Sequence, residues 1–154
     1  MQVWRICHRR HASGAFTGEG TRLVAGRWTP KGVRAVYTAG TLSLAALEMF
    51  VHMDVRHSHD ILAAISAGIP GDVEVSRVDT ETLPKDWRHS SPPPALALIG
   101  KGWLTRGDTA VLAVPSAIIP VEWNYLLNPA HPHFSRVTIG RPFKFEFDER
   151  MWKA

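Results

Sequence analysis

The sequence predicts an α+β fold: a single compact domain with a mixed or antiparallel β-core and flanking helices. The chain has 154 residues, the size of one domain, and 45% of them are apolar, enough for a buried core. Segments with the alternation of strands outnumber segments with helical periodicity. The helical segments do not alternate regularly with strands, as they would in a doubly wound sheet, and this favours the α+β class.

Two short strands are expected near the start of the chain. Residues 2–7, QVWRIC, alternate apolar and polar side chains, which is the pattern of a half-buried strand. Residues 8–26 contain four glycines and few apolar side chains, so they are expected to be mostly loop. Residues 33–38, VRAVYT, predict the second strand.

The clearest helix follows the second strand. Thr41 or Ser43 can be its N-cap, because a hydroxyl there accepts a hydrogen bond from a free N–H of the first turn. The helix continues through residues 44–53, LAALEMFVHM. The apolar side chains that fall near one another at helical spacing are Leu44, Ala45, Leu47, Met49 and Val51.

Most of the remaining chain predicts strands. Residues 60–69, DILAAISAGI, show period-two alternation, although a short helix also fits them. Residues 94–104, PALALIGKGWL, predict a helix that two glycines weaken. The other expected strands are residues 73–78, 110–114, 136–139 and 142–147.

Composition limits the expected location and partners. The net charge is +4, but the basic side chains are scattered along the sequence, which disfavours direct nucleic-acid binding. Cys7 is the single cysteine, so an internal disulfide is excluded and a reducing compartment is the simplest interpretation. No apolar run approaches the roughly 20 residues that a membrane-spanning helix needs, and the first residues lack the apolar region of a signal peptide. We therefore expect a cytoplasmic protein that does not associate with a membrane.

Several familiar catalytic patterns are missing from the sequence. Ser116, in VPSAIIP, follows an expected strand but lacks the Gly-x-Ser-x-Gly turn of α/β-hydrolases. Cys7 is expected to be a small core residue, and neither Gly-x-Gly-x-x-Gly nor a Walker loop is present. Two groups of histidines have neither a cysteine partner nor a familiar metal spacing, so no metal site is expected: His52, His57 and His59, and His131 and His133.

Three side chains each have two interpretations. Arg27 lies in AGRWTPKG, residues 25–32, a turn-forming segment; it either reaches an anionic ligand such as a pyrophosphate or lies on Trp28 at the surface. Glu48 lies in the most apolar helix, where it either faces water or turns into a cleft. Ser116 is either a turn hydroxyl bonded to its own backbone or part of a site.

Three motifs, in this order, resemble the RES-domain family, toxins of bacterial toxin–antitoxin pairs that are named after an arginine, a glutamate and a serine. GRWTPKG supplies Arg27, and AVYTAGTLSLAALEMFVH supplies Tyr37 and Glu48. LAVPSAIIPVEWNYLLNPAHPHF supplies Ser116. VWRI and FKFEFDERMW also look like the first and last strands of the family. The resemblance covers nearly the whole chain and implies a single RES-like domain at residues 1–154.

The resemblance implies a fold similar to ADP-ribosyltransferases of the diphtheria-toxin type, with NAD as the consumed substrate and no resident cofactor. Such an enzyme cleaves the nicotinamide–ribose bond as a glycohydrolase, a phosphorylase or an ADP-ribosyltransferase, and so arrests growth. The acceptor stays open between water, phosphate and a protein. The resemblance also implies an antitoxin with a helix-turn-helix region and a homodimer within a larger complex. Thr29 stands where relatives often carry asparagine, which puts its site role in doubt.

The residue types suit this chemistry. Breaking the bond passes through an oxocarbenium-like centre, which the Glu48 carboxylate would stabilise. The planar guanidinium of Arg27 suits a pyrophosphate, and Tyr37 offers a ring for nicotinamide and a hydroxyl for ribose. Ser116 would orient a ribose or a phosphate by a hydrogen bond. The expected catalytic residues are Arg27, Tyr37, Glu48 and Ser116, and the expected NAD-binding residues are Arg27, Trp28, Tyr37, Ser116 and Asn124.

Two other functions stay open from the residues alone. One is a non-catalytic module that binds a nucleotide or a nucleic acid by its positive charge, and the other is a small serine hydrolase built on Ser116. Expression separates them from the first hypothesis, because only an NAD-consuming toxin should stop growth and lower cellular NAD.

Overall fold

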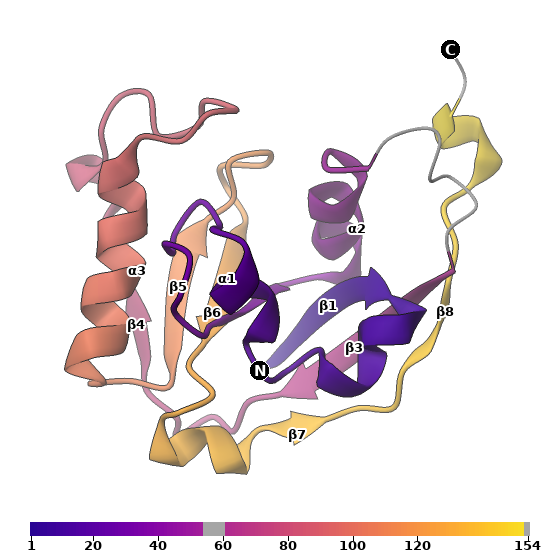
Figure 1. The fold of residues 1–154 in the computed structure, drawn as a ribbon, viewed down its shortest axis with the longest axis horizontal. Coiled ribbons are helices and arrows are strands. Elements are labelled where there is room, and N and C mark those ends of the chain that lie inside the picture. The colour runs from indigo at the N-terminus through magenta and orange to yellow at the C-terminus, as the bar shows by residue number, and fades with distance from the viewer. Residues whose placement is uncertain (54–60, 153–154) are drawn as a thin grey trace.

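A mixed β-sheet forms the centre of the computed structural model, which describes residues 1–53 and 61–152. Its strands are β1 (Gln2–His8), β2 (Val36–Ala39), β3 (Leu62–Gly68), β4 (Val75–Arg77), β5 (Val111–Pro115), β6 (Trp123–Leu127), β7 (Thr138–Ile139) and β8 (Phe143–Phe145). The order of the first seven within the described residues is β4-β5-β6-β2-β1-β3-β7 (Figure 1). β4 and β5 run parallel and the other neighbours run antiparallel, while β7 and β8 pair with opposite ends of β3.

In the described part of the chain, three α-helices and several short turns pack around this sheet. They are α1 (Glu19–Leu23), α2 (Leu42–Phe50) and α3 (Pro94–Arg106), with the 3-10 turns η1 (Arg9–Gly14), η3 (Thr80–Thr82), η4 (Pro132–Arg136) and η5 (Glu149–Trp152). α2 begins after Thr41, whose hydroxyl accepts the N–H of Leu44 at 3.0 Å. α3 has Pro94 in its first turn and ends at Gly107, which takes the left-handed conformation with φ +64°. None of the helices in the described residues is long and apolar enough to cross a bilayer.

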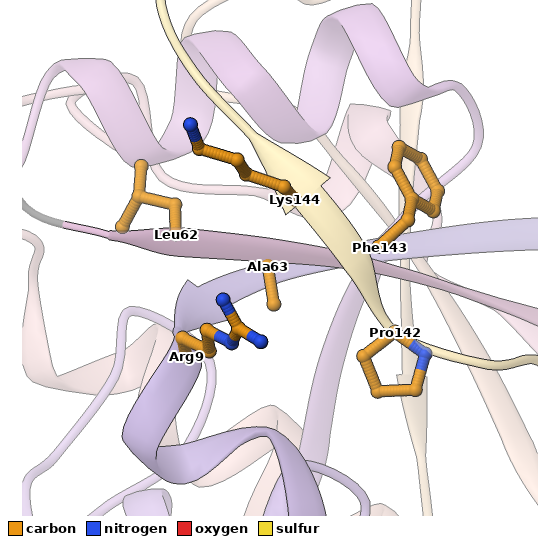
Figure 2. Close-up of a pocket in the computed structure, with 6 residues that line it drawn as sticks. All are labelled: Arg9, Leu62, Ala63, Pro142, Phe143 and Lys144. Atoms are coloured by element: carbon orange, nitrogen blue, oxygen red, sulfur yellow. The ribbon is translucent and has the colours of Figure 1, made fainter.

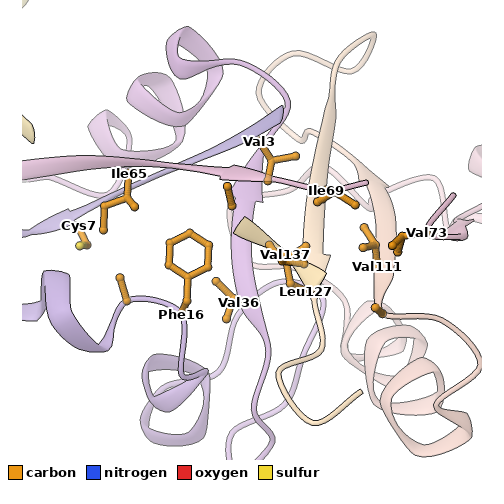
Figure 3. Close-up of a cluster of buried hydrophobic side chains, with 13 residues drawn as sticks. Val3, Cys7, Phe16, Val36, Ile65, Ile69, Val73, Val111, Leu127 and Val137 are labelled. Carbon is orange, nitrogen blue, oxygen red and sulfur yellow. The ribbon is translucent and has the colours of Figure 1, made fainter. Parts of the chain in front are cut away.

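The two faces of the sheet carry separate hydrophobic cores. Paired residues of antiparallel strands share a face, and successive residues of one strand point to opposite faces. Val36 pairs with Leu127, and Leu127 pairs with Val111, so these three side chains share a face. There they form one cluster with Phe16, from the segment that joins η1 to α1 (Figure 3).

The opposite face carries the two longer helices. Tyr37 and Ala39 alternate with Val36 along β2, so they point to this second face. Ala39 packs with Leu44 and Ala45 of α2. Farther along the same face, side chains of α3 pack on β5 and β6, and this cluster consists of Trp28, Val78, Leu96, Trp103, Leu112, Val114 and Leu126. The face covered by α2 and α3 is called the helical face below.

Most predicted elements are present, with bounds that differ by a few residues. The helix expected at residues 94–104 is α3, and the apolar run at 60–69 forms strand β3, although residue 60 lies outside the described residues. The strands expected at 2–7, 33–38 and 110–114 are β1, β2 and β5. Those expected at residues 73–78, 136–139 and 142–147 are present as the short strands β4, β7 and β8. The predicted α+β fold is therefore confirmed.

Three local expectations are wrong. Residues 8–26 are not mostly loop, because they contain η1 and α1. β6 was not predicted; Trp123, Asn124 and Tyr125 alternate, but Leu126 and Leu127 break the apolar–polar pattern. Helical spacing places Val51 on the apolar stripe, but α2 ends at Phe50 and Val51 is 55% exposed.

Candidate active site

The segment AGRWTPKG forms a tight turn that is fixed from several sides. The N–H of Gly26 donates to the carbonyl of Thr29 at 3.0 Å, which closes the turn. The hydroxyl of Tyr37, on β2, accepts the N–H of Trp28 at 3.0 Å and shares a 3.0 Å hydrogen bond with Thr29 Oγ1. A Cβ at position 26 would lie 2.5 Å from the Tyr37 hydroxyl oxygen, so only glycine allows this approach. The turn is therefore held by Tyr37 in one conformation.

Trp28 and Thr29 have structural roles in this turn. The Trp28 side chain is 2% exposed and packs against α3 and β5, and Thr29 has no exposed surface. The buried Trp28 ring therefore has no free face for a ligand, and the contribution of Trp28 to NAD binding stays a prediction. The hydroxyl of Thr29 forms a hydrogen bond with the Tyr37 hydroxyl.

Arg27, between Gly26 and this buried pair, is only partly buried. Its Nη1 donates to the carbonyl oxygen of Trp87 at 2.7 Å. The Trp87 ring also packs near the Trp28 ring, with the ring centres 6.3 Å apart. Partial burial lowers the pKa of the Arg27 guanidinium, while the nearby charge of Glu48 and the Tyr37 hydroxyl act in the opposite direction. Arg27 and Glu48 are therefore near enough for their charges to interact.

Two side chains from another part of the sheet hold the Glu48 carboxylate. Glu48 lies on α2 and is partly buried. Its Oε1 accepts the Ser116 hydroxyl at 2.8 Å and the Asn124 amide Nδ2 at 2.5 Å. Its second oxygen, Oε2, has no hydrogen-bond partner among residues 1–53 and 61–152. Within the described residues, one oxygen of Glu48 is thus fixed by two donors and the other accepts no hydrogen bond.

Ser116 lies at the start of the short connection between β5 and β6. Its N–H donates to the carbonyl of Glu122 at 3.0 Å, and its Oγ accepts the N–H groups of Ile118 and Ile119, both at 3.1 Å. Ser116 is thus both a turn hydroxyl and a partner of Glu48. Because Ser116 has no exposed surface, neither a direct contact with NAD nor the serine-hydrolase hypothesis fits this structure.

Asn124 and Tyr37 project from neighbouring strands to the helical face. Asn124 pairs with Ala39 across β6 and β2, and Leu126, two residues farther along β6, pairs with Tyr37. Paired residues share a face, so Asn124 and Tyr37 lie on the same side as α2. The sheet therefore positions two of the candidate groups, Asn124 and Tyr37, and α2 adds Glu48.

Tyr37 connects the helical face with the other side of the sheet. Its backbone carbonyl accepts Arg5 Nη1 at 2.8 Å, and its hydroxyl holds the 26–29 turn. Burial raises the pKa of the Tyr37 hydroxyl above 10.0, and its hydrogen bonds with Thr29 and Trp28 oppose this shift. The hydroxyl is therefore neutral at physiological pH and acts as a hydrogen-bonding group, not as a phenolate base.

Titration of tyrosinate absorbance is expected to show Tyr37 ionising at a pH above 10.0. A folded-state pKa above the unfolded value means that the stability from this group is present below about pH 10 and is lost as the pH rises through the folded pKa. The chain has two tyrosines, so subtracting the titration of Tyr37→Phe isolates this group. A Tyr37 transition at or below pH 10 would contradict the burial described here.

The best-formed surface hollows in the described residues lie elsewhere. One, of about 100 Å³, lies where β8 pairs with β3 and is lined by Arg9, Leu62, Ala63, Pro142, Phe143 and Lys144 (Figure 2). None of the four expected catalytic residues lines it. The candidate site is therefore defined by the convergence of Arg27, Glu48 and their partners. No group of three metal-binding side chains occurs in the described residues, and His57 and His59 fall outside them.

The sequence did not indicate Trp87 as a neighbour of the site. The backbone carbonyl of Trp87 accepts a hydrogen bond from Arg27, and the adjacent Arg88 donates its Nε to the carbonyl of Ala117 at 3.0 Å. One loop thus joins the 26–29 turn to the connection that follows Ser116. A backbone carbonyl has no signature in a sequence motif, so no local pattern could have found this contact.

Comparison with known proteins shows which family the chain belongs to. The family called RES domain matches residues 2–148. A relative from Photorhabdus laumondii, named Toxin Res, is 34% identical over 155 residues and aligns over 100% of this chain and 99% of its own length. A relative from Sphingobium sp., named Prs ADP-ribosylating toxin, is 30% identical over 162 residues, with 96% of this chain and 94% of its own length aligned.

A solved structure supports the fold independently of sequence. The M. tuberculosis MbcT–MbcA toxin–antitoxin complex contains a chain that superposes with a TM-score of 0.77. The match covers 98% of this chain and 86% of that one, at 13% sequence identity. The likeness of fold, the family match over nearly all residues and the curated relatives together show that this chain belongs to the RES domain family.

Proposed function

We propose that this chain is the toxin of a toxin–antitoxin pair and that it consumes NAD by breaking the bond between nicotinamide and ribose. The observation that carries the proposal is the arrangement around Glu48: Ser116 and Asn124 hold Oε1 at 2.8 and 2.5 Å, and Arg27 interacts with the carboxylate electrostatically. The relative named Prs ADP-ribosylating toxin supports the same class of chemistry.

The carboxylate would act on the ribose. As the nicotinamide–ribose bond breaks, its electron pair leaves with nicotinamide, and positive charge develops on the ribose carbon and ring oxygen. A fixed carboxylate stabilises this charge more than water does, because it needs no reorganisation during the reaction. Nicotinamide leaves as a neutral molecule, so the reaction requires no general acid.

Arg27 would hold the pyrophosphate that joins the two nucleosides. Nη1 is bound to the Trp87 carbonyl, which leaves Nε and Nη2 to donate to phosphate oxygens. Tyr37 would then act mainly through the 26–29 turn, by fixing the backbone from which Arg27 projects. Thus the two charged groups would act on opposite ends of one ligand.

The proposal also covers the partner and the place of action. A helix-turn-helix antitoxin would bind this chain, with a homodimer of the toxin in the larger complex. The neighbour of known structure, a toxin–antitoxin complex, supports an antitoxin partner. The single free cysteine, Cys7, which is 7% exposed, suits the reducing cytoplasm where NAD is available.

Incubation with NAD tests the proposal directly. The purified protein should release nicotinamide, and parallel reactions with and without inorganic phosphate should identify water or phosphate as the acceptor. If neither accepts ADP-ribose, labelled NAD and a cell extract should yield a labelled protein. If NAD stays intact under all three conditions while nucleotides still bind, a non-catalytic binding module would explain the site better.

Arg27→Ala is expected to weaken NAD binding by about 10- to 100-fold, since it removes charge-assisted hydrogen bonds to the phosphates. Calorimetry with NAD or ADP-ribose measures the affinity. Arg106→Ala is the control, because it removes the same charge from an exposed position at the C-terminus of α3. Equal affinities for the parental protein and Arg27→Ala would place Arg27 outside the ligand site.

A further inference from the structure

Asn124 is an unusual residue in this structure. Its Nδ2 donates to Glu48 Oε1 at 2.5 Å, while its Oδ1 is buried and has no hydrogen-bond partner within the described residues. A buried polar atom without a partner destabilises the folded state, and such atoms are rare in proteins. An apolar side chain would avoid this penalty, so the amide is better explained by its bond to Glu48 than by a contribution to folding.

The amide is also well placed for fixing the carboxylate. Glu48, Ser116 and Asn124 come from α2, from the β5–β6 connection and from β6. Both donors bind the same oxygen, Oε1, from different elements. Two donors on one oxygen restrict rotation of the carboxylate, and this keeps Oε2 in one orientation.

We propose that Asn124 is a positioning residue: it holds Oε1 of Glu48 so that Oε2 faces the substrate, and Asn124 itself does not touch NAD. This inference rests on the proposed function and changes the expected role of Asn124 from ligand contact to support of the carboxylate. The buried Oδ1 agrees with this role, because an atom with almost no accessible surface is not available to a ligand.

The orientation of the amide supports the same conclusion. If the amide were flipped, Oδ1 would lie 2.5 Å from Glu48 Oε1, and two acceptors would repel each other. Oε1 is an acceptor, so it selects the orientation with Nδ2 toward it.

Kinetics of Asn124→Ala should separate the two roles. We expect kcat to fall by about 10- to 100-fold while KM for NAD changes little, since misplaced catalytic groups reduce the rate of chemistry. The melting temperature should not fall, because the variant also removes an unpaired buried oxygen. A raised KM with unchanged kcat would show that Asn124 binds NAD, and an unchanged kcat and KM would show that it does neither; each result overturns the proposal.

Asn128→Ala is the matched control. Asn128 follows β6, is 5% exposed, and accepts the N–H of Ala130 at 3.0 Å through its Oδ1. Its loss leaves a backbone N–H without this acceptor, so the melting temperature should fall while kcat stays near the parental value. If the two variants lose stability and kcat in parallel, the effect at Asn124 is merely structural.

Asn124→Asp keeps the shape and reverses the electrostatics. A second carboxylate at 2.5 Å from Oε1 would repel Glu48, so this near-isosteric variant should lose more kcat than Asn124→Ala. A residue that only fills space would give the opposite ranking. That opposite ranking would overturn the positioning role.

Nuclear magnetic resonance provides a test that does not depend on NAD turnover. In ¹⁵N-labelled protein, the two side-chain amide protons of Asn124 should have widely separated shifts, because one donates to a carboxylate. Glu48→Gln should change these shifts, whereas Glu74→Gln, at an exposed position, should not. Unchanged shifts in Glu48→Gln would overturn the proposal even if the protein consumes NAD. A parental protein that leaves NAD intact but shows the shift change would instead refute only the proposed function.

Discussion

Replacement of Glu48 by glutamine is expected to reduce NAD consumption by about 100-fold or more while the fold is retained. The glutamine carbonyl can replace Oε1 as the acceptor for Ser116 and Asn124, so both hydrogen bonds at 2.8 and 2.5 Å have a substitute. The negative charge is lost, and with it the stabilisation of the developing positive charge on ribose. This variant should therefore lose activity while its stability stays near the parental value.

Release of nicotinamide by the purified variant measures the loss of activity, and thermal unfolding measures the fold. Glu74→Gln provides the control, because it makes the same chemical change at an exposed position outside the site. Expression of Glu48→Gln should also leave cell growth unaffected. If the folded Glu48→Gln protein consumed NAD at the parental rate, the Glu48 carboxylate would have no role in the mechanism.

Gly100→Ala is expected to destabilise the protein by about 3 kcal/mol, the upper range for inserting atoms into a packed interior. A Cβ at position 100 would lie 1.9 Å from the carbonyl oxygen of Trp28 and 3.2 Å from the Thr29 methyl group. Backbone atoms cannot move aside as a flexible side chain does, so α3 or the 26–29 turn must shift. The variant should also bind NAD more weakly, because Arg27 projects from this turn.

Gly102→Ala, in the same helix, separates packing from helix propensity. A Cβ there would meet only the end of the flexible Arg106 side chain, at 3.3 Å. Alanine favours a helix over glycine by up to about 1 kcal/mol, so this variant should be as stable as the parent or slightly more stable. Urea unfolding of both variants measures the difference. Equal stability of the two variants would show that the contact between Gly100 and Trp28 is not tight.

The fold class was predictable because it depends on patterns that are local in the sequence. Alternation in residues 2–7 and the hydroxyl cap at Thr41 correspond directly to β1 and to the start of α2. β6 was missed because its pattern reflects two different environments. Leu126 is buried under α3, whereas Asn124 on the same face serves Glu48. A polar site residue such as Asn124 therefore interrupts the apolar pattern by which a strand is recognised in a sequence.

The candidate site was predictable only as a set of residues. The sequence motifs name Arg27, Tyr37, Glu48 and Ser116, but they do not say which of these would meet a ligand. The burial of Ser116 and the saturation of its hydroxyl by Ile118, Ile119 and Glu48 depend on how a loop and a helix pack together. Such long-range packing has no local signature. Two glycines lower the helix propensity of α3. At Gly100 the reason is again long-range packing, because the missing side chain allows close contact with the Trp28 backbone.

The turn of residues 26–29 has a consequence for inhibitor discovery. Its backbone is braced by Tyr37 on one side and by Gly100 on the other. If this turn holds the phosphates of NAD as proposed, binding does not have to order a loop, so compact, rigid compounds should bind efficiently for their size. Fragment screening could then start from the free protein, with an anionic group aimed at Arg27 as the first chemical feature to vary.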